Sequence, residues 1–190
     1  RMIGIFERMP SVDAKFIFSY DPKQYISNAE NRGALFNRLK VPYVAHRLKT
    51  TIRTNKEIAS FIDKLLDLRR LNYDPHFRYR NIHLQYFDDA EALRKFLDHL
   101  KSREGWEVFG AHRSVQEIIG LEFDKVAVVI DEHFHYVNGR LYSKGRPAEH
   151  QARQMLFQQM TRAREELFIV VYRNFEVLKR CLEILRRRQL

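Results

Sequence analysis

The sequence of 190 residues contains a single cysteine, Cys181. One cysteine cannot form an internal disulfide, and it excludes a metal site built from several cysteines. Apolar residues surround it at helical spacing, at Val177, Leu178, Leu182 and Leu185, so we expect a buried thiol on the apolar face of a helix. A free thiol of this kind suits the reducing cytoplasm, where we expect the protein to reside.

Long apolar runs are also absent. The longest aliphatic runs, residues 126–130 and 168–172, have the length of a buried strand and are too short to cross a bilayer. The start of the chain, RMIGIFERMP, lacks the apolar centre of a signal peptide. We therefore expect no membrane partner. Because residue 1 is arginine, we expect the chain to be part of a longer protein.

Glycine is scarce, with seven residues in the whole chain. The phosphate-binding loop G-x-x-x-x-G-K-[ST] needs glycines at fixed positions, because their backbone amides wrap the phosphates while the lysine neutralises charge. Neither this pattern nor G-x-G-x-x-G occurs. The chain alone therefore has no recognisable means of gripping a nucleotide.

Acidic residues are outnumbered: 34 Lys and Arg stand against 24 Asp and Glu, which gives a formal net charge of +10. A basic surface favours polyanions, of which nucleic acid is the usual one, although a soluble domain can also simply be basic. With 45% hydrophobic and 31% charged residues, the chain has the composition of one globular domain with one core.

Predicted strands and helices alternate along the chain. Apolar runs predict strands at residues 14–20, 43–49, 82–87, 106–110, 125–131 and 167–172. Helical spacing predicts helices after residues 54–57 and after Asp88, and over 149–163 and 175–188. The central strands are apolar on both faces, as parallel strands covered by helices must be. We therefore predict a three-layer α/β domain with a mainly parallel sheet.

Shorter signals mark turns and helix ends. Thr54 lies three residues before Glu57, the spacing of a capping box, and Asp88 is placed to cap the next helix. Residues 136–141 predict a hairpin with an Asn-Gly turn. The stretch 71–80, LNYDPHFRYR, is predicted to be a long loop. Its aromatic and basic residues suit either contact with a single strand of nucleic acid or packing of the aromatics onto the core.

Four segments occur in a fixed order. Segment A (16–24) is a strand that ends in Asp-x-x-Gln. Segment B (48–58) places Arg53 directly before a capped helix. Segment C (114–124) has the sequence SVQEIIGLEFD, and segment D (155–167) has the sequence MLFQQMTRAREEL. The order of the four segments carries more information than any one of them.

Together these segments resemble motifs III, IV, V and VI of the superfamily 1 helicases of the UvrD/Rep type. The sequence is more closely similar to the helicase-like ATP-binding proteins grouped with the Schlafen family. The resemblance covers residues 16–167 and implies a second, C-terminal RecA-like domain. In such proteins ATP lies between two RecA-like domains, and the first domain carries the P-loop and the acidic motif that holds Mg²⁺. The implied partners are this first domain and single-stranded or partly duplex DNA, or RNA.

The resemblance also implies roles for residues of this sequence. Arg162 would be the arginine finger of motif VI, Arg53 the arginine of motif IV, and Gln24 the sensor of the γ-phosphate. An arginine suits this task because charge spreads over the phosphoryl oxygens in the transition state, and a planar, permanently charged fork can contact two of them. Taken without the motifs, Arg162 and Arg53 could instead lie on a solvated surface, and Asp-x-x-Gln could be a simple turn.

Segment C supplies the remaining implied roles. Gly120 would let the backbone approach the phosphates, and Glu122 would accept a hydrogen bond from the ribose, or else pair locally. Ser114 and Gln116 would contact the nucleic-acid backbone. Several positions depart from the family pattern: Tyr20 replaces a glycine, Gln116 and Ile119 replace a histidine and a lysine, and Gln154 replaces an arginine. A translocase, an RNA enzyme or an ATPase that does not unwind would each fit these departures.

The pair Asp131-Glu132 ends an apolar strand, as a magnesium-binding pair would. The resemblance places the acidic motif upstream of residue 1, so we interpret the pair as a strand end that leads into the hairpin. A metal nuclease built on Asp131, Glu132, His133 and His135 is an alternative, although we expect no metal site on this chain. A third hypothesis is a degenerate helicase-like module that binds nucleic acid or a partner without ATP chemistry.

Overall fold

The computed structural model describes residues 54–70, 77–110, 121–144 and 149–186. The strands predicted at 14–20 and 43–49 lie outside the described residues. A parallel sheet of four strands forms the centre, in the order β1-β6-β3-β2. These strands are β1 (Ile82–Phe87), β6 (Ala163–Tyr172), β3 (Phe123–Ile130) and β2 (Glu107–Phe109). The predicted α/β class with a parallel sheet is confirmed.

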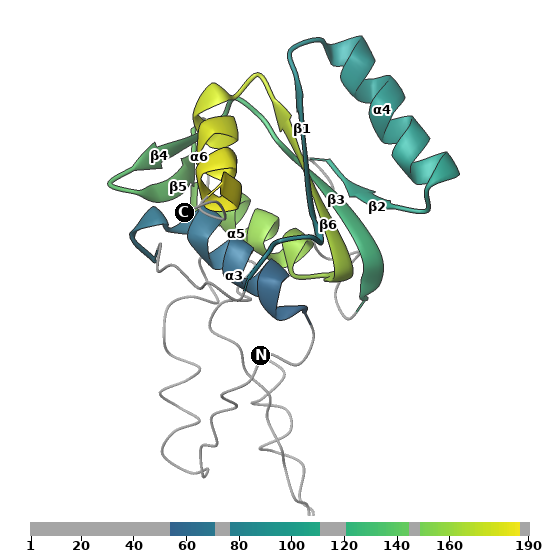
Figure 1. Cartoon of the computed structure of the whole chain (residues 1–190). Coiled ribbons are helices and arrows are strands. Elements are labelled where there is room, and N and C mark those ends of the chain that lie inside the picture. Colours follow the sequence, from purple (N-terminus) through teal and green to yellow (C-terminus); the bar gives the residue numbers. More distant parts are fainter. Residues whose placement is uncertain (1–53, 71–76, 111–120, 145–148, 187–190) are drawn as a thin grey trace, which may run out of the picture.

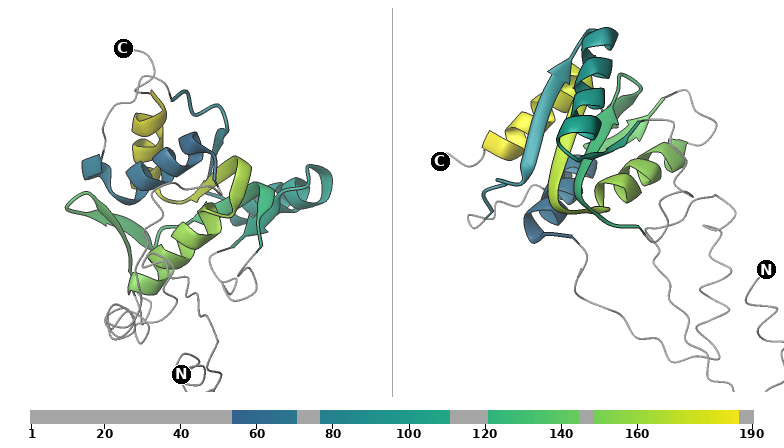
Figure 2. Two further views of the ribbon diagram at one scale, coloured as in Figure 1. Left: turned by 90° about the horizontal axis from the view of Figure 1, so that it is seen from below. Right: turned by 90° about the vertical axis from the view of Figure 1, so that its right-hand side faces the viewer.

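Helices cover both faces of the sheet and complete three layers (Figures 1 and 2). One face carries α3 (Lys56–Leu66), α5 (Glu149–Met160) and α6 (Phe175–Arg186), and the other carries α4 (Ala90–Arg103). Alternation along β3 explains the split: Val126 and Val128 belong to the large core under the three helices, whereas Ala127 packs with Leu100 of α4 and Trp106. Residues on alternate sides of one strand thus build two cores.

The predicted hairpin is confirmed as β4 (Phe134–Val137) and β5 (Arg140–Ser143). Its turn residues Asn138 and Gly139 have φ values of 48° and 76°, the left-handed backbone that two-residue hairpin turns require. The turn rests on a short 3-10 helix, η1 (Leu68–Arg70), through a hydrogen bond of 2.8 Å from Leu68 N to Gly139 O. The hairpin is therefore tied to the end of α3.

Both predicted helix caps are off by one residue. Asn55, not Thr54, caps α3, because its side chain accepts a hydrogen bond of 2.8 Å from Glu57 N. Asp89, not Asp88, caps α4 through Ala92 N. Asn and Asp are as good N-caps as Thr, so the sequence pattern alone could not choose between neighbours.

Segment D was predicted to be helical as far as residue 163, but α5 ends at Met160 and β6 begins at Ala163. The first residues of β6 pair with β3, with Ala163 opposite Phe123 and Glu166 opposite Lys125. Pairing with a neighbouring strand therefore overrides the helix propensity of the Ala-Arg-Glu-Glu run.

Cys181 is fully buried on α6, as predicted. Burial raises the pKa of its thiol to about 12, so the thiol is inert at neutral pH. Within the part of the chain that the structure describes, no helix is both long and apolar enough to cross a membrane.

Candidate functional site at the amino end of the sheet

The ends of segments C and D meet where β3 and β6 begin. These two strands are parallel neighbours, and they start at paired residues, Phe123 and Ala163. A backbone hydrogen bond of 3.0 Å from Phe123 N to Arg162 O holds the two segments together before the strands start. We call this the amino end of the sheet, and the opposite side its carboxyl end.

Segment B reaches the same place through Thr54. The Thr54 side chain is buried, and its Oγ1 donates a hydrogen bond of 3.1 Å to Thr161 O, across a sequence separation of 107 residues. Thr54 directly precedes Asn55, the cap of α3. The start of α3 is therefore fixed against the turn that separates α5 from β6. Three of the four segments thus converge on this end.

Arg162 lies inside this junction. The residue is only 5% exposed, and its Nη1 donates to Leu121 O at 3.4 Å, which is a long and weak hydrogen bond. An arginine stays charged even when it is buried, so it needs acceptors around it. The resemblance implies that Arg162 reaches a nucleotide bound by another domain. In this structure its side chain is held within its own domain, against the backbone of segment C.

The neighbours of Arg162 are open to solvent. Leu121 is 48% exposed, which is unusual for a large apolar side chain. Glu122 is exposed beside it. Arg164 is exposed as well, and its Nη1 lies 3.9 Å from Asp124 Oδ1. The amino end therefore presents an apolar side chain and charges of both signs around a buried guanidinium.

Of the residues that the sequence singled out, the structure describes Arg162 and Glu122. It brings the Arg162 side chain to the residue next to Glu122. The other predicted site residues lie outside the described residues and stay predictions: Gln24, Arg53, Ser114, Gln116 and Gly120.

A hollow of about 380 Å³ adjoins this junction. Strand β1 starts opposite Leu167, so no strand of the described residues lies beside the first residues of β6 on that side. The hollow left there is lined by Asn55, Arg80, Asn81, Arg164, Glu165 and Glu166. Sequence reasoning missed Thr54 as a link, and it also missed this hollow. Arg164 was the one available signal for the hollow, because it lies two residues after Arg162 in segment D and lines the hollow.

The aromatic and basic loop partly belongs to the core. Tyr79 is buried, and its ring meets Phe61 edge to face at 6.1 Å between centroids. Lys64 Nζ donates to the Tyr79 hydroxyl at 2.6 Å. Glu57 accepts hydrogen bonds from Arg78 N and Arg80 N, at 2.9 and 3.2 Å. For these residues the structure favours packing onto the core over base stacking.

The Asp131-Glu132 pair lies at the carboxyl end, where the fold uses its polar groups. Asp131 Oδ1 accepts from His133 N at 3.1 Å, and Asp131 O accepts from Asn174 Nδ2 at 2.8 Å. Among the residues that the structure describes, no three His, Cys, Asp or Glu side chains are grouped to hold a metal ion. The described part of the chain thus gives the nuclease alternative no geometric support.

Neither a protein-family model nor a curated protein matches this chain. The functional inference therefore depends on the residues themselves and on how the fold brings them together.

Proposed function

We propose that this chain is the second RecA-like domain of an ATP-dependent superfamily 1 helicase or translocase that acts on DNA. The observation that carries the proposal is the convergence of segments B, C and D at the amino end of the sheet. Thr54 contacts Thr161, and Arg162 contacts Leu121 and Phe123. Segments far apart in the sequence meet there, as residues that serve one bound nucleotide must.

In this proposal a first RecA-like domain binds ATP and Mg²⁺ and docks on the amino end. The described residues provide neither a phosphate cradle nor a group of metal ligands, so the nucleotide would belong mainly to that first domain. The exposed Leu121 side chain suits a contact between domains. Glu122 would face the ribose, and Arg162, Arg53 and Gln24 would face the γ-phosphate.

Arg162 would have to exchange acceptors in this role. Its bond to Leu121 O is 3.4 Å long and therefore weak. A phosphoryl group that carries developing negative charge is a stronger acceptor than a neutral carbonyl. We propose that docking of the first domain turns the guanidinium from the carbonyl to the nucleotide.

The test is ATP hydrolysis by the full-length protein, with and without single-stranded DNA. We expect stimulation by DNA, and a loss of roughly a thousandfold in Arg162→Ala. Arg162→Lys keeps the charge without the fork and should also lose most of the activity. Arg94→Ala, which removes an exposed charge on α4, is the matched control and should behave like the wild type.

Thermal unfolding of each variant separates lost catalysis from lost folding, because Arg162 is buried. We expect the 190-residue chain by itself to be inactive. ATP hydrolysis by this isolated chain at the rate of the full-length protein would contradict the proposal, as would a folded Arg162→Lys variant with full activity.

The burial of Arg162 favours one alternative. If the Arg162 guanidinium serves only to hold segment C in place, it takes no part in catalysis. The protein would then be a degenerate module that binds nucleic acid or a partner without hydrolysing ATP. In that case the folded full-length protein binds DNA, shows no hydrolysis with or without it, and loses stability but no other function in Arg162→Ala.

A further inference from the structure

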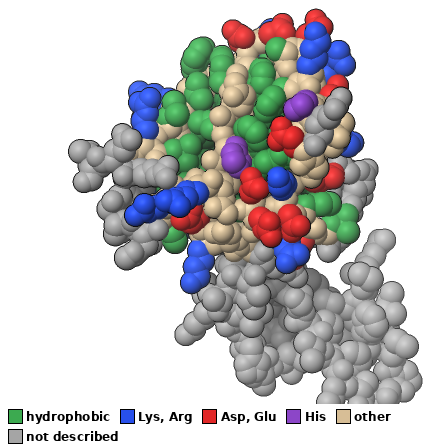
Figure 3. All heavy atoms as spheres, turned by 45° about the vertical axis from the view of Figure 1, so that its right-hand side comes forward, with side chains coloured by type: hydrophobic (Ala, Val, Ile, Leu, Met, Phe, Trp, Pro, Cys, Tyr) green, Lys and Arg blue, Asp and Glu red, His purple; other side chains and the backbone are tan. Residues whose placement is uncertain are grey.

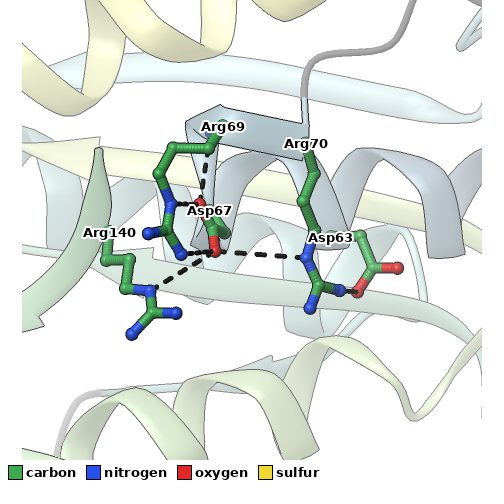
Figure 4. Close-up of polar contacts among 5 residues, drawn as sticks. All are labelled: Asp63, Asp67, Arg69, Arg70 and Arg140. Carbon is green, nitrogen blue, oxygen red and sulfur yellow. Dashed lines mark hydrogen bonds and ion pairs between the residues drawn. The ribbon is translucent and has the colours of Figure 1, made fainter. Parts of the chain in front are cut away.

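A cluster of arginines gathers around one carboxylate at the far end of α3. Asp67 follows the last turn of α3, and its side chain is 8% exposed. It accepts hydrogen bonds from Arg69 Nε at 2.8 Å and Arg69 Nη2 at 2.6 Å, and from Arg140 Nε at 3.4 Å. Arg70 Nε lies 4.0 Å away. Figure 4 shows the three arginines turned toward this carboxylate.

Counted over the described residues alone, positive charge exceeds negative charge in this cluster. Arg153 of α5 also lies within electrostatic range, because Arg140 and Arg70 repel its charge and Asp67 attracts it. The only other carboxylate in Figure 4 is Asp63, 3.8 Å from Arg70 Nη1. Four guanidiniums thus face two carboxylates, and arginine does not lose its proton at physiological pH. We call Arg69, Arg70, Arg140 and Arg153 the arginine patch.

Three of these side chains are open to solvent: those of Arg69, Arg70 and Arg140 are 53%, 59% and 47% exposed. Arg69 alone grips Asp67 with two nitrogens. The contacts of Arg70 are ion pairs of 3.8 and 4.0 Å, beyond hydrogen-bond distance. Its guanidinium and the outer nitrogens of Arg140 are therefore poorly used by the contacts that the described residues make.

Arg153, which is partly buried, also has unused hydrogen-bonding capacity. Its Nε is buried with no hydrogen-bond partner among the described residues. Burial lowers its pKa, and Arg140 and Arg70 add to that effect. Repulsion of this kind costs free energy in the absence of an anion. A bound anion would reduce the repulsion and accept the unused hydrogen bonds.

We propose that the arginine patch contacts the phosphate backbone of a nucleic-acid strand, as a second contact separate from the amino end of the sheet. The choice of a nucleic acid as the anion rests on the proposed function.

Helix α3 joins the two places. It has 11 residues, so its ends lie about 16 Å apart. Its first residues meet segment D, and its last turn leads into the arginine patch. A strand bound at the arginine patch would therefore lie about one helix length away from the place where the nucleotide is proposed to bind.

The test compares two double variants of the 190-residue chain by fluorescence anisotropy with a labelled single-stranded oligonucleotide over a range of salt concentrations. Arg70→Gln with Arg140→Gln removes two patch charges and leaves the Arg69 grip on Asp67 intact. Arg94→Gln with Lys95→Gln removes two charges from α4, where each is paired with an acid on the same helix. Figure 3 shows acidic and basic side chains close together on one face of the molecule.

Each lost phosphate contact should lower the slope of log affinity against log salt by about 0.7–0.9. We expect a decrease of about 1.4–1.8 for the patch variant and the wild-type slope for the α4 variant. Arg70→Lys with Arg140→Lys keeps both charges and should restore most of the slope, which separates lost charge from a damaged fold.

Equal slopes in the patch and α4 variants would overturn the proposal. So would a patch variant that binds the oligonucleotide like the wild type but no longer binds vesicles of phosphatidylcholine and phosphatidylserine. Failure of the proposed function would show in a different measurement, as full ATP hydrolysis by a folded Arg162→Lys variant, and the salt slope does not depend on hydrolysis.

Discussion

The two ends of the parallel sheet are built differently. At the carboxyl end, the buried Asn174 side chain makes three hydrogen bonds: Nδ2 donates to Asp131 O and Phe134 O at 2.8 and 2.7 Å, and Oδ1 accepts from Val177 N at 3.0 Å. At the amino end, the bonds that link segments include one of 3.1 Å from Thr54 Oγ1 to Thr161 O and one of 3.4 Å from Arg162 Nη1 to Leu121 O. One side chain thus links three elements at the first end, whereas at the second end different side chains link different segments.

This difference bears on where a ligand can bind. Open α/β sheets usually bind ligands outside the carboxyl ends of their strands. Here Asn174 ties the end of β6, the start of α6 and the turn into the hairpin together, so the backbone groups of Asp131, Phe134 and Val177 that it bonds are already used. The two described residues of the predicted site, Glu122 and Arg162, lie at the other end, beside the paired starts of β3 and β6. A domain built this way suits a site whose nucleotide is carried by a neighbouring domain.

The largest expected difference between the two ends is in ATP hydrolysis. Against a loss of roughly a thousandfold in Arg162→Ala, we expect Asp131→Asn to hydrolyse ATP like the wild type. The substitution keeps an oxygen for His133 N and leaves the backbone bond to Asn174 unchanged. Steady-state ATP hydrolysis by the full-length variants is the measurement. A large loss in Asp131→Asn would return the acidic pair to the active site and reverse the assignment of the two ends.

In stability, we expect the larger loss from a substitution at the carboxyl end. Asn174→Ala leaves two carbonyls and one backbone N–H without their partner in a buried place, so we expect a loss of about 3 kcal/mol in the free energy of unfolding. Asn81→Ala is the matched control, because Asn81 makes one exposed hydrogen bond, to Glu165 O, and should lose less than about 1 kcal/mol. Urea unfolding of both variants measures the difference. Equal losses would mean that Asn174 does not close the carboxyl end.

The sequence predicted the elements well wherever one periodicity was clear. Strand β1 and the hairpin turn agree with their predicted residues, because alternation and an Asn-Gly pair depend on local geometry alone. The start of β6 was wrong, because pairing with β3 is a long-range effect that no local pattern in segment D contains.

The candidate site was predictable only as a set of segments. Their convergence follows from strand order, and strand order is not written in any one segment. The burial of Arg162 and the link from Thr54 to Thr161 depend on the packing of α3 against the turn before β6. The arginine patch was missed for the same reason: Arg70, Arg140 and Arg153 come from three elements that are distant in the sequence.

Asp67 tests a charged link between the end of α3 and the hairpin. Hydrogen bonding by Arg69, more than any other contact, holds the pKa of Asp67 well below its usual range. Asp67→Asn should lower the free energy of unfolding at pH 7 by about 1–2 kcal/mol, a value reduced by the solvent exposure of the arginines.

The pH dependence of this effect has a definite sign. A lowered folded-state pKa stabilises the protein above the unfolded pKa of about 3.9, and that stability is lost as the pH falls below it. The difference between wild type and Asp67→Asn should therefore be constant from about pH 7 to pH 5 and shrink below about pH 4. Urea unfolding at several pH values is the measurement. A difference that grows on acidification would contradict the role of Asp67 as a buried anion.

The smallest expected effect belongs to the single bond at the amino end. Thr54→Val keeps the shape of the side chain and removes the hydrogen bond to Thr161 O, so we expect a loss of about 1 kcal/mol in the free energy of unfolding. Thr54→Ser keeps the hydroxyl and serves as the control. If the amino end is the looser of the two, hydrogen exchange should rise in Thr54→Val at the amides near Thr161 and stay unchanged at Val177, whose N–H is bound by Asn174. Increased exchange near both Thr161 and Val177 would mean that the two ends of the sheet open together. The two ends would then differ in the residues that they contain but not in their local stability.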